Sequence, residues 1–137
     1  MSIHGHCLCG TIQYEVRAPL EDVDHCHCSF CRRSHGAAFA TYGRAAASDV
    51  EVRTGQDALR VYASSEPVKR SFCGECGSNL FYEHAALEGA IMVAVATLAE
   101  TATIKPEAHI FVGSKAAWHT IDDDLPQHET FPPGVAD

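Results

Sequence analysis

Residues 7–17 read CLCGTIQYEVR, a stretch that joins a cysteine pair to the clearest strand pattern in the chain. Polar and apolar side chains alternate after the turn at Gly10, with every second residue from Ile12 to Val16 apolar. Such alternation is typical of a half-buried β-strand. Cys7 and Cys9 are separated by one residue, so in an extended segment both sulfurs point to the same side, with Cα atoms roughly 6.5 Å apart. This spacing suits two corners of a zinc tetrahedron.

The remaining cysteines also lie in tight groups. Cys26, Cys28 and Cys31 form a Cys-x-Cys-x-x-Cys motif, and Cys73 and Cys76 form a Cys-x-x-Cys motif. All seven cysteines therefore fall in motifs, and none is left over. Redox-active thiols would explain the Cys-x-x-Cys spacing but would leave the Cys-x-Cys pairs unused. Zinc binding explains all seven cysteines.

Seven sulfurs divide naturally into four and three, because structural zinc sites have four ligands and catalytic sites keep one position open. In the division that we favour, the structural site combines two pairs that are far apart in the chain: Cys7 and Cys9, Cys73 and Cys76. The second zinc site is local, keeps a free fourth position and consists of the central group: Cys26, Cys28 and Cys31. An alternative places the Cys-x-x-Cys pair with two of the central cysteines, and the spacing leaves this alternative open.

Short apolar or alternating segments separated by turn residues continue along the chain and predict an all-β fold with little helix. We expect strands over residues 11–17, 23–28, 37–42, 50–53, 59–62, 68–72, 80–82, 90–95 and 108–112. The strand at 37–42 is expected to end at Gly43. Single helical turns are expected over residues 29–34 and 114–118.

Length and composition favour a single soluble domain over residues 1–137, with an irregular, acidic and Pro-rich tail from about residue 122. The formal net charge is -8 and no long basic run occurs, so nucleic-acid binding is not expected. The longest apolar run, residues 89–96, is too short to cross a membrane. The first residues lack the pattern of a secretory signal, so we expect a cytoplasmic protein with reduced thiols.

The cysteine motifs and their surroundings resemble those of the glutathione-dependent formaldehyde-activating enzyme family, which includes centromere protein V. The resemblance extends from about residue 4 to about residue 119 and rests on these segments: CLCGT at 7–11, CHCSFCRR at 26–33, FCGECGS at 72–78, and residues 91–97, 106–110 and 115–118. It implies a β-rich, tent-like fold with a four-cysteine structural zinc and a second zinc held by three cysteines. The implied ligand sets agree with the division favoured above.

The resemblance also implies an activity, which is the condensation of formaldehyde with glutathione to S-hydroxymethylglutathione by a carbon–sulfur lyase. Its partners would be a small thiol such as glutathione and a small aldehyde. The charge and the short apolar runs predict no nucleic-acid or membrane partner, and the oligomeric state is left open. The chain is shorter than the founding type at the N-terminus and in its loops, where substrate-binding segments often lie. A zinc-stabilised binding module without chemistry is the alternative, and a fourth protein ligand on the second zinc would favour it.

Several residues near the cysteines are candidates for chemistry. His35 follows Cys31 by four residues, so a helical turn would place both on one face, and His35 is our candidate fourth ligand or catalytic base. Arg32 and Arg33 follow the three-cysteine motif directly and are our candidates for binding an acidic thiol such as glutathione. A second pair of candidate cations precedes the Cys-x-x-Cys motif: Lys69 and Arg70.

Three further residues are expected to have supporting roles. His27 lies between two cysteines of an extended segment and should point away from the metal. His109 lies among apolar residues and is expected to be a hydrogen-bonded core histidine. Trp118 is expected to anchor the core.

Overall fold

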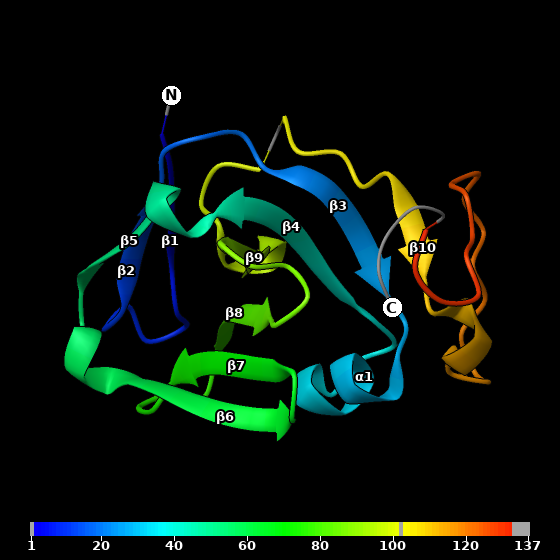
Figure 1. The fold of residues 1–137 in the computed structure, drawn as a ribbon, viewed down its shortest axis with the longest axis horizontal. Coiled ribbons are helices and arrows are strands. Elements are labelled where there is room, and N and C mark those ends of the chain that lie inside the picture. Colours follow the sequence, from blue (N-terminus) through cyan, green and yellow to red (C-terminus); the bar gives the residue numbers. More distant parts are fainter. Residues whose placement is uncertain (1, 102, 133–137) are drawn as a thin grey trace.

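The computed structural model describes residues 2–101 and 103–132, and within them the chain forms two β-sheets and one α-helix (Figure 1). The smaller sheet has the strand order β1-β2-β5, with bounds β1 Ile3–His6, β2 Gln13–Val16 and β5 Val50–Thr54. The larger sheet has the order β10-β3-β4-β9-β8-β7-β6. Its bounds are β3 Glu21–Cys26, β4 Ala40–Ala46, β6 Leu59–Ser65, β7 Val68–Cys73, β8 Asn79–His84, β9 Ala90–Ala94 and β10 Ala108–Ile110. The expected all-β class is confirmed.

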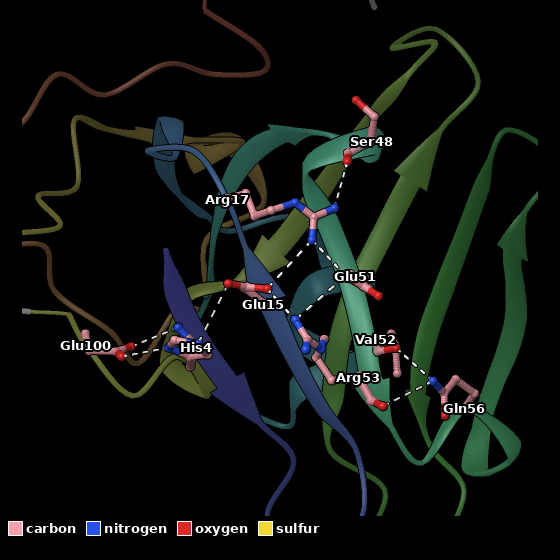
Figure 2. A network of polar contacts seen from close by, with 9 residues as sticks. All are labelled: His4, Glu15, Arg17, Ser48, Glu51, Val52, Arg53, Gln56 and Glu100. Atoms are coloured by element: carbon pink, nitrogen blue, oxygen red, sulfur yellow. Dashed lines mark hydrogen bonds and ion pairs between the residues drawn. The ribbon is translucent and has the colours of Figure 1, made fainter. Parts of the chain in front are cut away.

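The smaller sheet has one buried and one charged face, as the alternation in residues 12–16 predicts. Every second residue from Ile12 to Val16 is buried. The opposite face carries a network of ion pairs across the strands (Figure 2), with Arg53 Nη1 2.8 Å from Glu15 Oε1 and Arg17 Nη1 2.8 Å from Glu51 Oε1. Exposed pairs of this kind contribute at most about 1 kcal/mol each, so the buried face stabilises the sheet more than the charged one.

The larger sheet is antiparallel except at its edge, where β10 runs parallel to β3. Gly43 does not end its strand as expected. It lies inside β4 opposite Val93, and a Cβ at this position would lie 2.9 Å from the side chain of Leu20. The glycine therefore permits close packing within a strand that continues to Ala46.

Two groups of buried residues form the core. The first lies between the sheets, where the rings of Tyr14 and Phe81 meet edge to face at 4.9 Å between centroids, and it includes Cys7 and Cys73. The second packs on the other part of the larger sheet and includes Cys26 and Cys31. Each core group thus contains sulfurs of a different cysteine set.

The helix α1, Ser29–His35, follows directly after β3 and confirms the helical turn expected at 29–34. Other helical turns are of the 3-10 type: η1 Ala47–Asp49, η2 Gln56–Ala58, η3 Val95–Thr97 and η4 Val112–Ser114. The helical turn expected at 114–118 is wrong: η4 ends at Ser114, and residues 117–118 form only a hydrogen-bonded turn. The expectation for Trp118 is wrong, because this side chain is 76% exposed.

The tail is irregular over residues 122–132, apart from an isolated bridge between His109 and Gln127. Residues 133–137, which the tail prediction also covers, lie outside the described part of the chain. The described residues contain no helix with the length and apolar character needed to cross a membrane.

Candidate metal centres

The first cysteine cluster joins the start of the chain to the end of β7. The Sγ atoms of its members all lie within 4.8 Å of one another: Cys7, Cys9, Cys73 and Cys76. Within this group, Cys9 Sγ lies 3.6 Å from Cys7 Sγ and 3.9 Å from Cys73 Sγ. The sulfurs thus gather in the grouping that the sequence favoured, and their donor set is the one that a tetrahedral structural zinc uses.

Backbone and hydroxyl donors surround these four sulfurs. The amide of Ile12 donates to Cys7 Sγ and the amide of Glu75 donates to Cys73 Sγ, both at 3.3 Å. The hydroxyl of Ser78 lies 3.3 Å from Cys76 Sγ, and its hydrogen bond lowers the pKa of that thiol to about 5. Such donors stabilise thiolates, which are the form of cysteine that binds metal. The surroundings of the cluster therefore fit a bound zinc ion.

The second cluster is local and spans the junction of β3 and α1. Cys26 is the last residue of β3, Cys28 caps the helix, and Cys31 lies in its first turn. Cys28 Sγ accepts the amide of Cys31 at 3.3 Å, and hydrogen bonds from the other two thiols lower its pKa. Their three sulfurs lie within 4.8 Å of one another, and no fourth histidine, cysteine or carboxylate of the described residues joins them. The cluster offers three ligands and leaves one position free.

Arg70, on β7, is the cation that reaches this second cluster. Its Nη2 lies 3.7 Å from Cys31 Sγ, its Nε donates to Ser64 at 3.1 Å, and its guanidinium lies 5.5 Å from the ring centroid of Tyr82. The side chain is only 6% exposed, and among the described ion pairs it has no carboxylate partner. Its Nη1 is buried and has no hydrogen-bond partner. A buried arginine needs a compensating charge, and the sulfurs of the cluster are the groups positioned to supply it.

The charges of the three sulfurs and of Arg70 can be used to test whether a metal ion fits this cluster. Three thiolates and one divalent cation carry a net charge of -1, which the single positive charge of Arg70 neutralises. The donor set and its counter-charge therefore fit zinc at Cys26, Cys28 and Cys31. The sequence ranked Arg70 behind Arg32 and Arg33 as the cation of this site, because Arg70 is far from the three-cysteine motif in the chain.

The two arginines that the sequence favoured as ligand-binding cations do not reach the three-sulfur cluster. Arg32 donates its Nε to the carbonyl oxygen of Ser114 at 3.1 Å, and Arg33 is exposed. Neither lines the cavities next to the cysteines. His35 also stays outside the sulfur cluster, and its Nε2 lies 2.6 Å from the hydroxyl of Tyr42.

Two cavities meet at the second cluster. A cavity of about 340 Å³ is lined by Cys26, Cys28 and Cys31 together with Arg70 and several apolar side chains. A larger one of about 660 Å³ shares Cys26 with it and is also lined by Tyr42. Volumes of this size are typical of small-molecule sites.

A chain of hydrogen bonds starts at His27, between two cysteines of the second cluster, and the sequence did not predict it. His27 is fully buried, and its Nε2 lies 2.8 Å from Nδ1 of His109, whose Nε2 lies 2.9 Å from a carboxylate oxygen of Asp123. Burial and the neighbouring His109 lower the pKa of His27 to about 4, so this ring is neutral at pH 7. The expected hydrogen-bonded core role of His109 is confirmed. The parallel pairing of β10 with β3 brings the two rings together, and no local pattern encodes this pairing.

Comparisons with known proteins agree with the cysteine motifs. A family model described as "Glutathione-dependent formaldehyde-activating enzyme" matches residues 2–114. A Halomonas elongata protein provisionally named as such an enzyme is 28% identical over 87 residues, which are 59% of this chain and 55% of that protein. A Phaeosphaeria nodorum protein with the same name is 27% identical over 79 residues, which are 58% of this chain and 42% of that protein. The chain therefore spans about half the length of these curated relatives.

The fold also resembles a solved structure. The crystal structure of a Rhodobacter sphaeroides protein superposes on this one with a TM-score of 0.61 at 32% sequence identity. The match covers 70% of this chain and 87% of that chain. The mostly-β architecture is thus shared with an experimentally determined structure.

Proposed function

Because the chain belongs to the glutathione-dependent formaldehyde-activating enzyme family, we propose that it is a zinc-dependent carbon–sulfur lyase that joins a thiol to a small aldehyde. Glutathione and formaldehyde are the pair that the family name indicates. The observation that carries the proposal is the three-sulfur cluster with a free position, which opens on a cavity and faces a buried arginine. A closed, four-ligand site would not offer a substrate this access.

The two clusters take different roles in the proposal. Zinc held by Cys7, Cys9, Cys73 and Cys76 fixes the fold. At Cys26, Cys28 and Cys31, bound zinc would supply a site where a thiol substrate is held as its thiolate at neutral pH. Arg70 stabilises the negative charge gathered on these sulfurs, and the cavity gives a substrate access to them.

The reaction needs only one proton transfer. The thiol sulfur forms a bond to the aldehyde carbon, the π pair of the carbonyl moves to its oxygen, and the proton released by the thiol ends on that oxygen. Tyr42 and His35 are placed for this transfer, because the Tyr42 hydroxyl hydrogen-bonds to His35 Nε2 and Tyr42 lines the larger cavity. Burial lowers the pKa of His35, which favours the neutral ring, and a neutral Nε2 can accept the hydrogen bond of the Tyr42 hydroxyl.

Cobalt substitution tests the proposal directly, since thiolate ligation changes the visible spectrum of Co(II). Glutathione and other small thiols should perturb the spectrum of the wild-type cobalt protein. Cys28→Ser should abolish the change. Lys69→Gln should preserve it, because Lys69, although a candidate cation from the sequence, is exposed on β7 and lines neither cavity at the cluster. NMR exchange between formaldehyde and the thiol should be faster with protein than without. If no thiol perturbs the metal and exchange is not accelerated, the binding-module alternative takes the place of the enzyme.

A further inference from the structure

The cavity next to the second cluster has an aromatic wall. Phe30, one residue before Cys31, is 49% exposed although it is a large apolar side chain. Phe111 and Phe131 meet edge to face with ring centroids 4.9 Å apart, and both line the same cavity as Phe30. Three phenyl rings from separate parts of the chain therefore line the cavity that the three sulfurs also line.

One of these rings is held at a backbone conformation that phenylalanine rarely adopts. Phe111 has a φ of 58°, in the left-handed region that favours glycine. The segment is fixed there by hydrogen bonds from the Phe111 amide to Thr130 and from the Ser114 amide to the Phe111 carbonyl. Glycine would adopt this conformation without strain, whereas the phenyl ring packs against Phe131 and the second core group, contacts that offset the strain.

The cavity is poorly equipped for an acidic ligand. Glutathione carries two carboxylates and one ammonium group, and its binding calls for free cations near the metal. The arginine that lines this cavity is Arg70, whose Nε and Nη2 are engaged by Ser64 and Cys31, so only its Nη1 is left for the two carboxylates of glutathione. Arg32 and Arg33 do not line it.

The larger cavity has carboxylates of its own. Its lining includes Asp22, Asp24 and Glu107, and its arginine, Arg44, is paired with Asp22 at 2.8 Å. A thiol that carries carboxylates would therefore meet like charges on one side of the cluster and phenyl rings on the other. Its carboxylates would be repelled at the first wall and left without enough cations at the second, which would weaken its binding.

We propose that the thiol accepted at the second cluster carries an apolar group of about phenyl size, which packs against Phe30, Phe111 and Phe131. The proposal rests on the proposed function and deepens it by naming the class of thiol. The sulfur of such a ligand would take the free position, and its carbon group would fill the apolar cavity of about 340 Å³. Affinity would then come from buried apolar area and not from ion pairs.

Matched thiols provide the test. 2-Phenylethanethiol and 3-mercaptopropionate share the same thiol and two-carbon chain and differ in a phenyl ring against a carboxylate. Titrated into the cobalt protein, the phenyl compound should bind about tenfold or more tightly than 3-mercaptopropionate and glutathione, with a negative heat-capacity change measured by calorimetry. If glutathione binds as tightly as the phenyl compound, this inference is overturned and the proposed function stands. If none of the thiols binds, the proposed function fails and the inference fails with it.

A substitution of Phe111 separates recognition from folding. Phe111→Gly should keep the fold, because glycine suits the positive φ, yet weaken binding of 2-phenylethanethiol about tenfold and leave 2-mercaptoethanol unaffected. Tyr62→Ala is the control, since Tyr62 is an exposed aromatic residue on β6 outside the cavity. Phe30→Ala, at a half-exposed position, gives the same comparison if Phe111→Gly does not fold. The proposal would be overturned if the substitution weakened the binding of 2-phenylethanethiol and 2-mercaptoethanol equally, or weakened the binding of neither.

Discussion

The two cysteine clusters use the same side chain but are built in opposite ways. The four-sulfur cluster joins segments 64 or more residues apart, whereas the three-sulfur cluster lies within residues 26–31. Backbone amides of Ile12 and Glu75 donate to sulfurs of the first cluster, while a buried arginine side chain faces the second. The second cluster opens on a cavity and leaves one ligand position free.

This difference indicates how one chain can combine stability and chemistry. A cluster that ties distant segments together stabilises the fold when it binds metal, because the unfolded chain cannot preserve the site. A local cluster adds little to long-range order, so it can keep an open position without endangering the fold. If the roles divide in this way, substitutions at the two clusters should differ in their effects, and the largest effect should fall on the fold.

The largest effect should follow from removing a ligand of the four-sulfur cluster. Cys76→Ser should leave the protein unfolded or insoluble, because binding free energy at a structural zinc site is on the order of 10 kcal/mol, comparable with the whole stability of a domain. Far-UV circular dichroism and metal content per chain would measure this. Glu75→Ser, an exposed change in the same turn, is the control. A Cys76→Ser protein that folds normally and retains its full metal content would show that this cluster is not a structural metal site.

A ligand of the three-sulfur cluster should be removable without unfolding. Cys28→Ser keeps a helix cap, because serine is a favoured residue at the N-cap position that Cys28 occupies. We expect metal content to fall from two ions to one, the response to thiols to disappear, and the circular dichroism spectrum to stay. Mild chelation of the wild-type protein should give the same result. Unfolding in step with the first metal lost would show that the clusters do not differ as we propose.

A smaller effect should follow from removing the counter-charge of the second cluster. Arg70→Gln should weaken zinc binding there by about tenfold to hundredfold, the range typical of outer groups that support metal ligands. Competition with a chromogenic chelator would measure the affinity, with Arg70→Lys expected to be intermediate. Lys69→Gln, on the exposed side of the same strand, should have no effect. Unchanged affinity in Arg70→Gln would mean that the guanidinium does not balance the charge of the cluster.

The sequence predicted those parts of the molecule that depend on neighbours in the chain. Alternation over residues 12–16 located a strand, and the short spacings located both sulfur groups. The strand β1, Ile3–His6, was missed, because its glycine and two histidines give no apolar alternation beyond Ile3. Gly43 was misread as a strand end, since its packing against Leu20 depends on tertiary contacts.

The rest of the second site depends on strand order, which no local pattern encodes. Arg70 approaches Cys31 from β7, and His109 approaches His27 from β10. Proximity in sequence favoured Arg32 and Arg33 as the relevant cations, but the helix directs Arg32 toward the carbonyl of Ser114. The sulfur clusters were therefore predictable, whereas the groups that surround them were not.

The smallest effect concerns the core beside the four-sulfur cluster. Tyr14 is buried there, its hydroxyl hydrogen-bonds to Thr97, and burial raises its pKa to about 12. Tyr14→Phe should lower the free energy of unfolding by about 1 kcal/mol at pH 7 through loss of this hydrogen bond. It should also change the alkaline limb of the stability curve. The folded state favours the neutral phenol. Its contribution to the free energy of unfolding is therefore complete below pH 10 and is lost as the pH rises toward 12.

Urea unfolding of both proteins at pH 7 and between pH 10 and 11.5 would measure this difference. The wild-type protein should lose about 2 kcal/mol more over the alkaline range than Tyr14→Phe, because only the wild type has a phenol that ionises more easily when unfolded. Thiol binding at the three-sulfur cluster should be unchanged at pH 7, since Tyr14 belongs to the other core group. A loss of thiol binding in Tyr14→Phe would show that the two regions are energetically coupled and would contradict the division of roles between them.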